Sequence, residues 1–147
     1  MGKRRKAREL VTQILFHMEY NPGDPEKSFK LICDNFNTPK SLRYFVKGIV
    51  KGIHENGKFI DNIIRKSSKN WRLERMSRVD RSIIRLSVYE MFFIDDIPPK
   101  VSIDEAVELG KKYGTEESGS FINGVLDNVF LVNIKDNAEG NPVESNK

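Results

Sequence analysis

One stretch, residues 78–93 (RVDRSIIRLSVYEMFF), constrains the fold more than any other part of the sequence. At about 100° per residue its apolar side chains fall on two faces of a helix, which together cover most of the circumference. A surface helix needs only one apolar stripe, so this helix must pack against neighbours on several sides. We therefore expect a central core helix whose remaining strip, with Arg78, Arg81 and Arg85, faces solvent. Glu90 lies on an apolar face, and we expect its carboxylate to bond a neighbouring helix end or a cation.

The remaining segments repeat the helical spacing of apolar residues, and none alternates as a strand would. The sequence thus predicts an all-α protein of about seven helices. Polar residues placed to accept from the free amides of a helix start are Asp24, Thr38, Ser77, Ser102 and Thr115. Gly124, inside the last predicted helix, costs helix stability, so we expect a close crossing with another helix at that position.

The predicted helices divide at a basic segment, residues 65–78, whose only anchor into the core would be Trp71. After Ile134 the sequence lacks the apolar residues that would offset the entropy of ordering, so we expect a disordered tail. We therefore predict one helical domain at residues 1–135, followed by a tail at residues 136–147. The N-terminal half of the domain is expected at residues 3–66 and the C-terminal half at residues 77–134.

The charge of the chain is unevenly distributed. The net charge is +4, but residues 1–100 hold 21 Lys or Arg against 12 Asp or Glu, and residues 101–147 hold 4 against 9. This asymmetry suggests a polyanion on the basic side of the molecule and a different partner on the acidic side. A single cysteine, Cys33, excludes a disulfide framework, and we expect it to be a small core residue. No signal peptide or long apolar run is present, so we expect a soluble, cytoplasmic protein without a membrane role.

The first predicted helix combines a basic start with an outward aromatic residue. Five cations lie within residues 3–8, and Phe16 falls opposite the apolar arc, beside Arg5, Thr12 and Tyr20. An aromatic ring among cations suits base stacking next to phosphate contacts, so this helix is a candidate for binding RNA or DNA. A second packing contact for Phe16, or a basic start that is merely solvated, stays open as an alternative.

No motif for catalysis, a metal or a cofactor is present. Residues 52–59 (GIHENGKF) match the spacing of a phosphate-binding loop through Lys58, but Phe59 stands where Ser or Thr should hold magnesium. His17 and His54 lie on separate predicted helices without a ligand or nucleophile at a suitable spacing. We therefore expect a protein that is not an enzyme and needs no cofactor or metal.

Three segments together resemble one known family. They are KRRKARELVTQILF at the start, IIRLSVYEM in the centre and VSIDEAVELGKKYGTEESGSFINGVLDNV near the end. They are similar to the bacterial transcription antitermination factors of the NusB family, and the similarity runs from about Arg4 to Val132. The resemblance implies two three-helix bundles packed roughly perpendicular. It also implies binding, with ribosomal protein NusE, to the boxA element of leader RNA, and assistance to RNA polymerase in reading through ribosomal RNA operons.

The resemblance also assigns residues by position. An acid at Glu117 should repel phosphate and temper affinity, and Phe16 stands where the family often has a tyrosine. Asp80 matches an acidic position that the family turns towards its protein partner. The RNA-binding residues that the resemblance implies are Arg4, Arg5, Lys6, Arg8, Phe16, Glu117 and Phe121.

Two other functions remain compatible with the sequence. One is a protein-interaction bundle or homodimer that does not recognise a specific RNA. The other is an RNA-targeting module such as those that precede the catalytic domain of some ribosomal RNA methyltransferases, although this chain carries no cofactor domain of its own.

Overall fold

The fold is described by a computed structural model for residues 2–68 and 70–135. This part of the chain forms seven α-helices and two short helical segments, without a strand, which confirms the predicted all-α class. The elements are α1 (Gly2–Tyr20), α2 (Pro25–Asn35), α3 (Lys40–Glu55), α4 (Gly57–Ser67), η1 (Leu73–Arg75), α5 (Arg78–Phe93), α6 (Pro99–Tyr113), α7 (Ser118–Phe130) and η2 (Leu131–Lys135).

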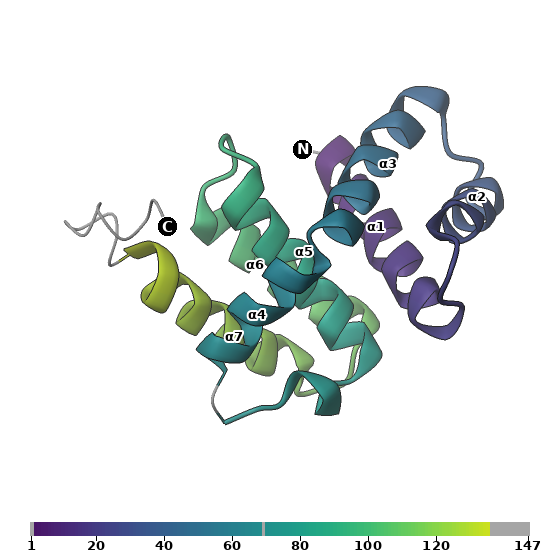
Figure 1. Ribbon diagram of the computed structural model, residues 1–147. Helices are drawn as coiled ribbons and strands as arrows, with labels where there is room; N and C mark the ends of the chain where they lie inside the picture. The colour runs from purple at the N-terminus through teal and green to yellow at the C-terminus, as the bar shows by residue number, and fades with distance from the viewer. Residues whose placement is uncertain (1, 69, 136–147) are drawn as a thin grey trace.

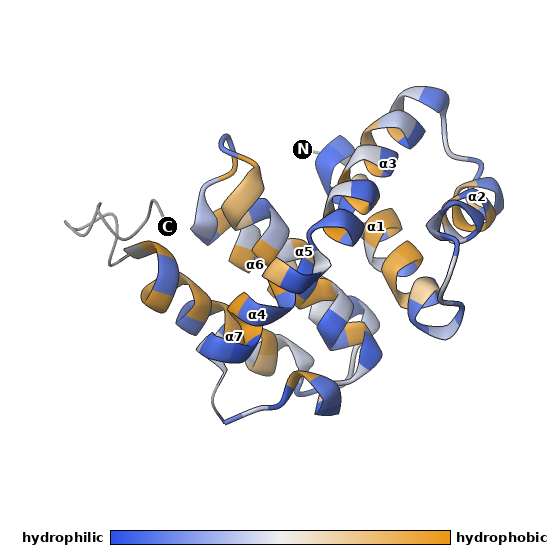
Figure 2. Ribbon diagram, viewed as in Figure 1, coloured by the Kyte–Doolittle hydropathy of each residue, from blue (hydrophilic) through white to orange (hydrophobic). Residues whose placement is uncertain are grey.

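The predicted central helix is α5. It contacts α1, α3, α4, α6 and α7, and it crosses the middle of the molecule in Figure 1. Ile83, Ile84 and Val88 are fully buried, on both of the faces that the sequence marked as apolar. Hydrophobic residues run along α7 and meet those of the other helices at the centre, as Figure 2 shows. The core of the molecule is therefore organised around α5.

The helices pack in two groups that α5 connects. Helices α1, α2 and α3 contact one another, and α5, α6 and α7 form a second mutually packed set (Figure 1). Helix α4 contacts α5 and α7 as well as α3, so it belongs with the second group. The predicted boundary at the basic segment, residues 65–78, would instead put α4 in the first group. The helix contacts show that the change from the first group to the second occurs near Asn56, between α3 and α4.

Two of the predicted helix caps are present and three are wrong. Thr38 is not a cap, because the residue before α3 is Pro39 and no side chain in the described part of the chain caps that helix. The side chains of Asp24 and Ser77 accept hydrogen bonds from the first turns of α2 and α5. Helix α6, however, begins at Pro99, because the fixed backbone of a proline suits the first helical position. Ser102 is therefore inside the helix and buried. Thr115 is also not a cap, because α7 begins at Ser118, whose hydroxyl instead accepts from the Thr115 amide.

The predicted close crossing at Gly124 is wrong. Gly124 is exposed, and a Cβ atom built there would meet no atom within 4 Å. The close approach between α6 and α7 occurs at Gly110, where a Cβ would lie 2.6 Å from Cδ1 of Ile122. The two helices approach closely at Gly110 because the side chain of Ile122 packs against this glycine. The periodicity of α7 alone does not indicate which glycine lies at the crossing.

These two glycines lead to opposite predictions for stability. Gly124→Ala should raise the free energy of unfolding by roughly 1 kcal/mol, because it removes the helix penalty of an exposed glycine. Gly110→Ala should lower it by about 1 to 3 kcal/mol, because the added methyl group displaces Ile122 in a packed core. Urea unfolding monitored by circular dichroism measures both changes. Equal changes in the free energy of unfolding for the two substitutions would contradict this packing.

Cys33 is fully buried, as predicted for a core residue. Within the described residues, no helix combines the length and apolar character needed to cross a membrane. The predicted disordered tail, residues 136–147, lies outside the described residues.

Candidate nucleic-acid interface

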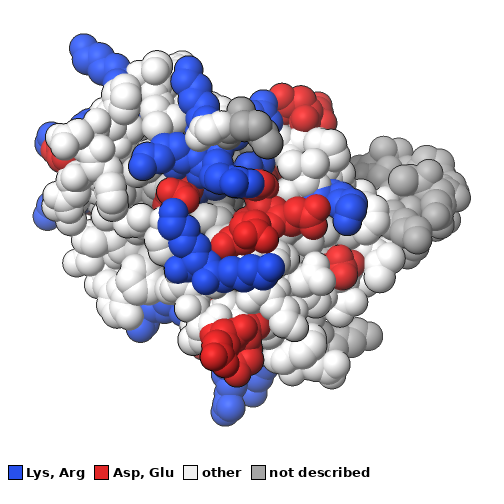
Figure 3. Space-filling model, turned by 180° about the vertical axis from the view of Figure 1, so that it is seen from behind, with Lys and Arg blue, Asp and Glu red and all other residues white. Residues whose placement is uncertain are grey.

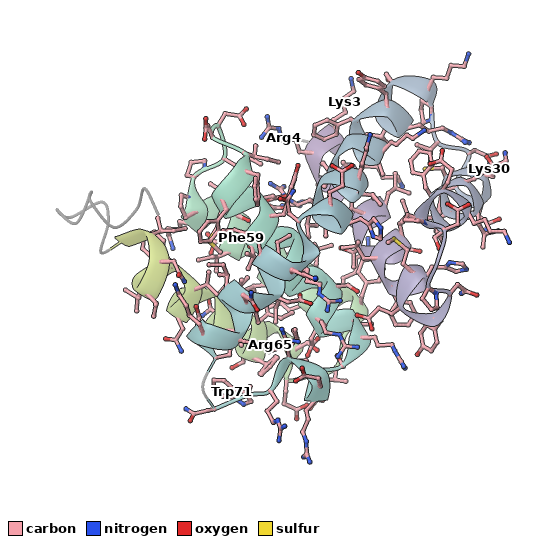
Figure 4. All side chains as sticks on the ribbon, viewed as in Figure 1. Lys3, Arg4, Lys30, Phe59, Arg65 and Trp71 are labelled. Carbon is pink, nitrogen blue, oxygen red and sulfur yellow. The ribbon has the colours of Figure 1, made fainter. Side chains whose placement is uncertain are left out.

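The first two turns of α1 carry the exposed cations that the sequence singled out. Lys3, Arg4, Arg5 and Lys6 are all exposed, and Figure 4 shows Lys3 and Arg4 at the free start of the helix. The Arg4 guanidinium lies 2.7 Å from the carboxylate of Asp96, in the turn after α5. The Lys6 ammonium lies 6.0 Å from the centre of the Phe36 ring. These cations lie at the surface, although Arg4 is paired with Asp96 and Arg5 with Glu105.

Arg8 differs from its basic neighbours, because its side chain is only 8% exposed. Its Nε and Nη2 atoms donate to the two carboxylate oxygens of Glu90 at 2.8 and 3.2 Å. The expectation that Arg8 contacts RNA does not fit this geometry, because the guanidinium is enclosed between α1 and α5. Arg8 positions α1 and neutralises a buried acid.

The Glu90 carboxylate is bonded from a second side as well. The Ser102 hydroxyl donates to Glu90 Oε1 at 2.8 Å and lies 2.8 Å from the hydroxyl of Ser87. All of these side chains are buried, so the hydrogen bonds compensate for the loss of hydration. The prediction that Glu90 bonds a cation is confirmed, and the cluster fixes α1, α5 and α6 to one another.

A charged groove runs between α1 and α6. It is lined by Arg5, Glu9, Glu105, Glu108 and Lys112, among other residues, and encloses about 350 Å³. Lys112 donates to Glu9 at 2.7 Å, and this carboxylate raises the pKa of Lys112. Acidic and basic side chains are interleaved across the face of the molecule seen in Figure 3. The basic start of α1 thus continues into a surface of mixed charge.

Phe16 is half-buried and takes part in an aromatic and cationic cluster. Its ring packs edge-to-face on Tyr20 at 5.1 Å, and the guanidinium of Arg78 lies 4.4 Å from the centre of the Tyr20 ring. The other predicted neighbour, Thr12, is buried and donates to the carbonyl oxygen of Arg8, so that part of the outward face was wrongly predicted. The cluster still combines aromatic rings with a cation at the surface.

The predicted basic strip of α5 is largely neutralised. Arg81 and Arg85 both bond the Glu19 carboxylate, and Arg85 also donates to Asp61 at 2.8 Å. Burial alone would raise the pKa of Glu19, but the two guanidinium groups outweigh it and lower that pKa overall. Of the three arginines predicted to face solvent, only Arg78 is exposed.

A second candidate site lies at the N-terminal ends of α5 and α7. A pocket of about 560 Å³ is lined by Trp71, Asp80, Glu117 and Phe121, together with other residues of the segment before α5. The Trp71 and Phe121 rings pack edge-to-face at 5.5 Å. Trp71 is 43% exposed, so the prediction that it anchors into the core is wrong. Phe121 is half-buried, and Glu117 is exposed at the rim.

Arginines and one acidic oxygen give this pocket its polar character. Arg72 and Arg75 are exposed and line it, although the sequence interpretation did not single them out. Oδ1 of Asp80 is buried without a hydrogen-bond partner among the described residues. Aromatic rings, guanidinium groups and a carboxylate together can contact a base, a phosphate and a donor from a partner.

The predicted site residues therefore fall into two groups. Arg4 and Lys3 lie at the start of α1, whereas Trp71 lies at the far end of the molecule in Figure 4. Among the described residues, His17 lies 2.7 Å from the hydroxyl of Ser28, which is buried. Within the described residues no cluster of acidic, His or Cys side chains could hold a metal.

Comparison with known proteins places this arrangement in a family. The model of the NusB family matches residues 5–130, which include every predicted site residue except Arg4. A transcription antitermination protein NusB from Desulfatibacillum aliphaticivorans is 47% identical over 131 residues, covering 89% of this chain and 92% of the relative.

Solved structures agree with the sequence comparison. A NusB structure from T. maritima has a TM-score of 0.81 and 40% identity, and the match covers 88% of this chain and 91% of that one. A crystal structure of antitermination factors NusB and NusE in complex with double-stranded RNA has a TM-score of 0.81 at 29% identity, covering 89% of this chain and 98% of that one. On both sequence and fold, the chain belongs to the NusB family.

Proposed function

We propose that this chain is a transcription antitermination factor that binds the boxA element of leader RNA together with ribosomal protein NusE. The observation that carries the proposal is that the family match includes Arg5 and Lys6, two of the exposed cations of α1, and the aromatic pocket at α7. The related complex of NusB, NusE and double-stranded RNA supports both partners. Such a factor acts by binding and catalyses no reaction.

The exposed residues of α1 would supply the phosphate contacts. Arg4, Arg5 and Lys6 are exposed on the first two turns, where each cation that neutralises a phosphate releases condensed counterions. Phe16 would stack on a base about three turns further along α1, next to Tyr20 and Arg78. Arg8 would act indirectly, because its pairing with Glu90 holds α1 against the core.

The pocket at α7 would be the place where RNA and the protein partner meet. Phe121 would stack on a base there, while Glu117 at the rim would weaken phosphate binding. Asp80 lines the same pocket, so its carboxylate would accept a hydrogen bond from NusE. Adjacent contacts of this kind would make the binding of RNA and of NusE cooperative. The assembled pair would join RNA polymerase in the cytoplasm.

Titration of labelled RNA tests this function. A boxA RNA and a scrambled RNA of equal length are titrated with the chain alone and with the chain plus NusE, at two salt concentrations. NusE should tighten binding to boxA and leave the scrambled RNA weakly bound. Equal binding of both RNAs, with and without NusE, would refute the proposal. Light scattering on the same samples identifies a homodimer, the alternative in which the basic helix is occupied by a second copy.

A further inference from the structure

We propose that Glu105 limits the RNA affinity of this chain by holding Arg5, and that RNA releases Arg5 while Glu105 keeps Arg8 as its partner. The inference rests on the proposed function, because it concerns the same basic helix. It adds an affinity-determining residue on α6, a helix to which the sequence interpretation assigned no RNA role.

The pairing of Arg5 occupies the edge of the guanidinium that binds anions best. Nε and Nη2 of Arg5 donate to Oε1 and Oε2 of Glu105 at 3.1 and 2.7 Å. This two-point geometry is the one in which a guanidinium also grips a phosphate. The hydrogen bond to Glu105, followed by its charge, raises the pKa of Arg5, and the bond from Arg5 chiefly lowers the pKa of Glu105. A phosphate must therefore compete with a carboxylate for the same edge.

The two partners differ in how easily they can move. The Arg5 side chain is 57% exposed, whereas that of Glu105 is 15% exposed and set between α1 and α6. A long exposed side chain can rotate towards a ligand, whereas a carboxylate enclosed in a groove cannot follow it. RNA binding should therefore move Arg5 and leave Glu105 in place.

Arg8 makes the release of Arg5 feasible. Its Nη1 atom lies 3.6 Å from Oε1 of Glu105, while its Nε and Nη2 atoms bond Glu90. When Arg5 leaves, Glu105 is still beside a buried cation and is not left as an isolated charge. Arg8 thus neutralises two carboxylates, Glu90 and Glu105, from its buried position in α1.

If Glu105 had a different role, removing its charge would change RNA affinity in the opposite direction. If Glu105 oriented Arg5 for RNA, removing its charge would weaken binding. The geometry favours competition, because both donors of the two-point edge are already used. Electrostatics favour competition too, since the charge of Glu105 offsets that of Arg5 at the interface, so that RNA binding releases fewer counterions.

The test compares Glu105→Gln with Glu26→Gln in complexes with NusE and boxA RNA. Glu26 forms an exposed ion pair with Lys47 at 2.9 Å between α2 and α3, so its substitution makes the same charge change at a different ion pair. Glu105→Gln should tighten RNA binding about two- to fivefold more than Glu26→Gln, the effect expected of a partly exposed pair. Its salt slope should steepen by roughly 0.7 to 0.9, the contribution of one additional cation.

A double-mutant cycle with Arg5→Ala separates release of Arg5 from a structural effect. Arg5→Ala should weaken RNA binding more in the Glu105→Gln background than in the wild type, because only there is Arg5 fully available. Thermal unfolding of each variant confirms that the fold is retained. A salt slope equal to that of Glu26→Gln, or weaker RNA binding, would overturn the role of Glu105 while selective boxA binding by the wild type persists. Loss of selectivity in the wild type itself would overturn the proposed function and this inference together.

Discussion

Arg8→Ala is expected to lower the free energy of unfolding by about 3 to 5 kcal/mol. The substitution leaves Glu90 with its charge buried, and removing one partner of a buried ion pair costs this much because the other is uncompensated. Ser102 still donates one hydrogen bond to Glu90, but it contributes no positive charge. Urea unfolding at neutral pH measures the loss.

The matched control removes both charges. Arg8→Met combined with Glu90→Leu keeps the volume of the two side chains, so the double variant should lose less stability than Arg8→Ala. Arg4→Ala is the surface control, because its pair with Asp96 is exposed on both sides and its loss should change stability little. A loss below roughly 1 kcal/mol for Arg8→Ala would mean that the pair does not hold α1 to α5.

Phe16→Ala is expected to weaken binding of the chain and NusE to boxA RNA by about 1 to 3 kcal/mol, the range for one base stacked on an aromatic ring. The ring is half-buried and contacts Tyr20, so the variant should retain the fold, as circular dichroism can show. Fluorescence anisotropy at fixed salt measures the affinity.

Tyr44→Ala provides the control for this change. Tyr44 is 84% exposed on α3, whereas the proposed RNA contacts lie on α1 and α7, so Tyr44 has no role in the proposed interface. Its loss should leave RNA affinity unchanged. If Phe16→Ala retains both its fold and its full RNA affinity, Phe16 is a packing residue, and stacking must be assigned to Phe121 or to another ring.

The central helix could be predicted from sequence because burial on several faces leaves a periodic trace within one segment. The all-α class followed for the same reason, since every described segment has the helical repeat. The cap at Ser102 could not be distinguished from a buried serine, because the pattern S-x-x-E is the same in both cases. Its environment depends on the two prolines that start α6 earlier.

The separate role of Arg8 had a signal that the sequence interpretation did not use. On the helical wheel Arg8 lies next to the apolar arc that includes Val11 and Leu15, and Glu90 was already expected to need a cation. The position of Arg8 at the edge of the arc and the requirement of Glu90 together point to the pair. Arg5 has the same side chain but lies away from the arc on the wheel, whereas Arg4 falls within the arc but lies in the first turn of α1, where it is exposed.

The pocket at α7 had no comparable signal. Trp71 and Phe121 are separated by 50 residues in sequence, and only the packing of α4, α5 and α7 brings them to 5.5 Å. Asp80 joins them because α5 begins beside the same segment. No local pattern specifies such a contact, so the sequence predicts only a basic loop for the segment with Arg72 and Arg75.

Amide hydrogen exchange of the complex with NusE, measured with and without boxA RNA, tests the proposed interface most directly. RNA should slow exchange in the first turns of α1, around Phe16 and at the start of α7 near Phe121, and leave α2 and the exposed face of α3 unchanged. Protection confined to α2 and α3, or none in α1, would contradict the assignment of RNA binding to the basic helix.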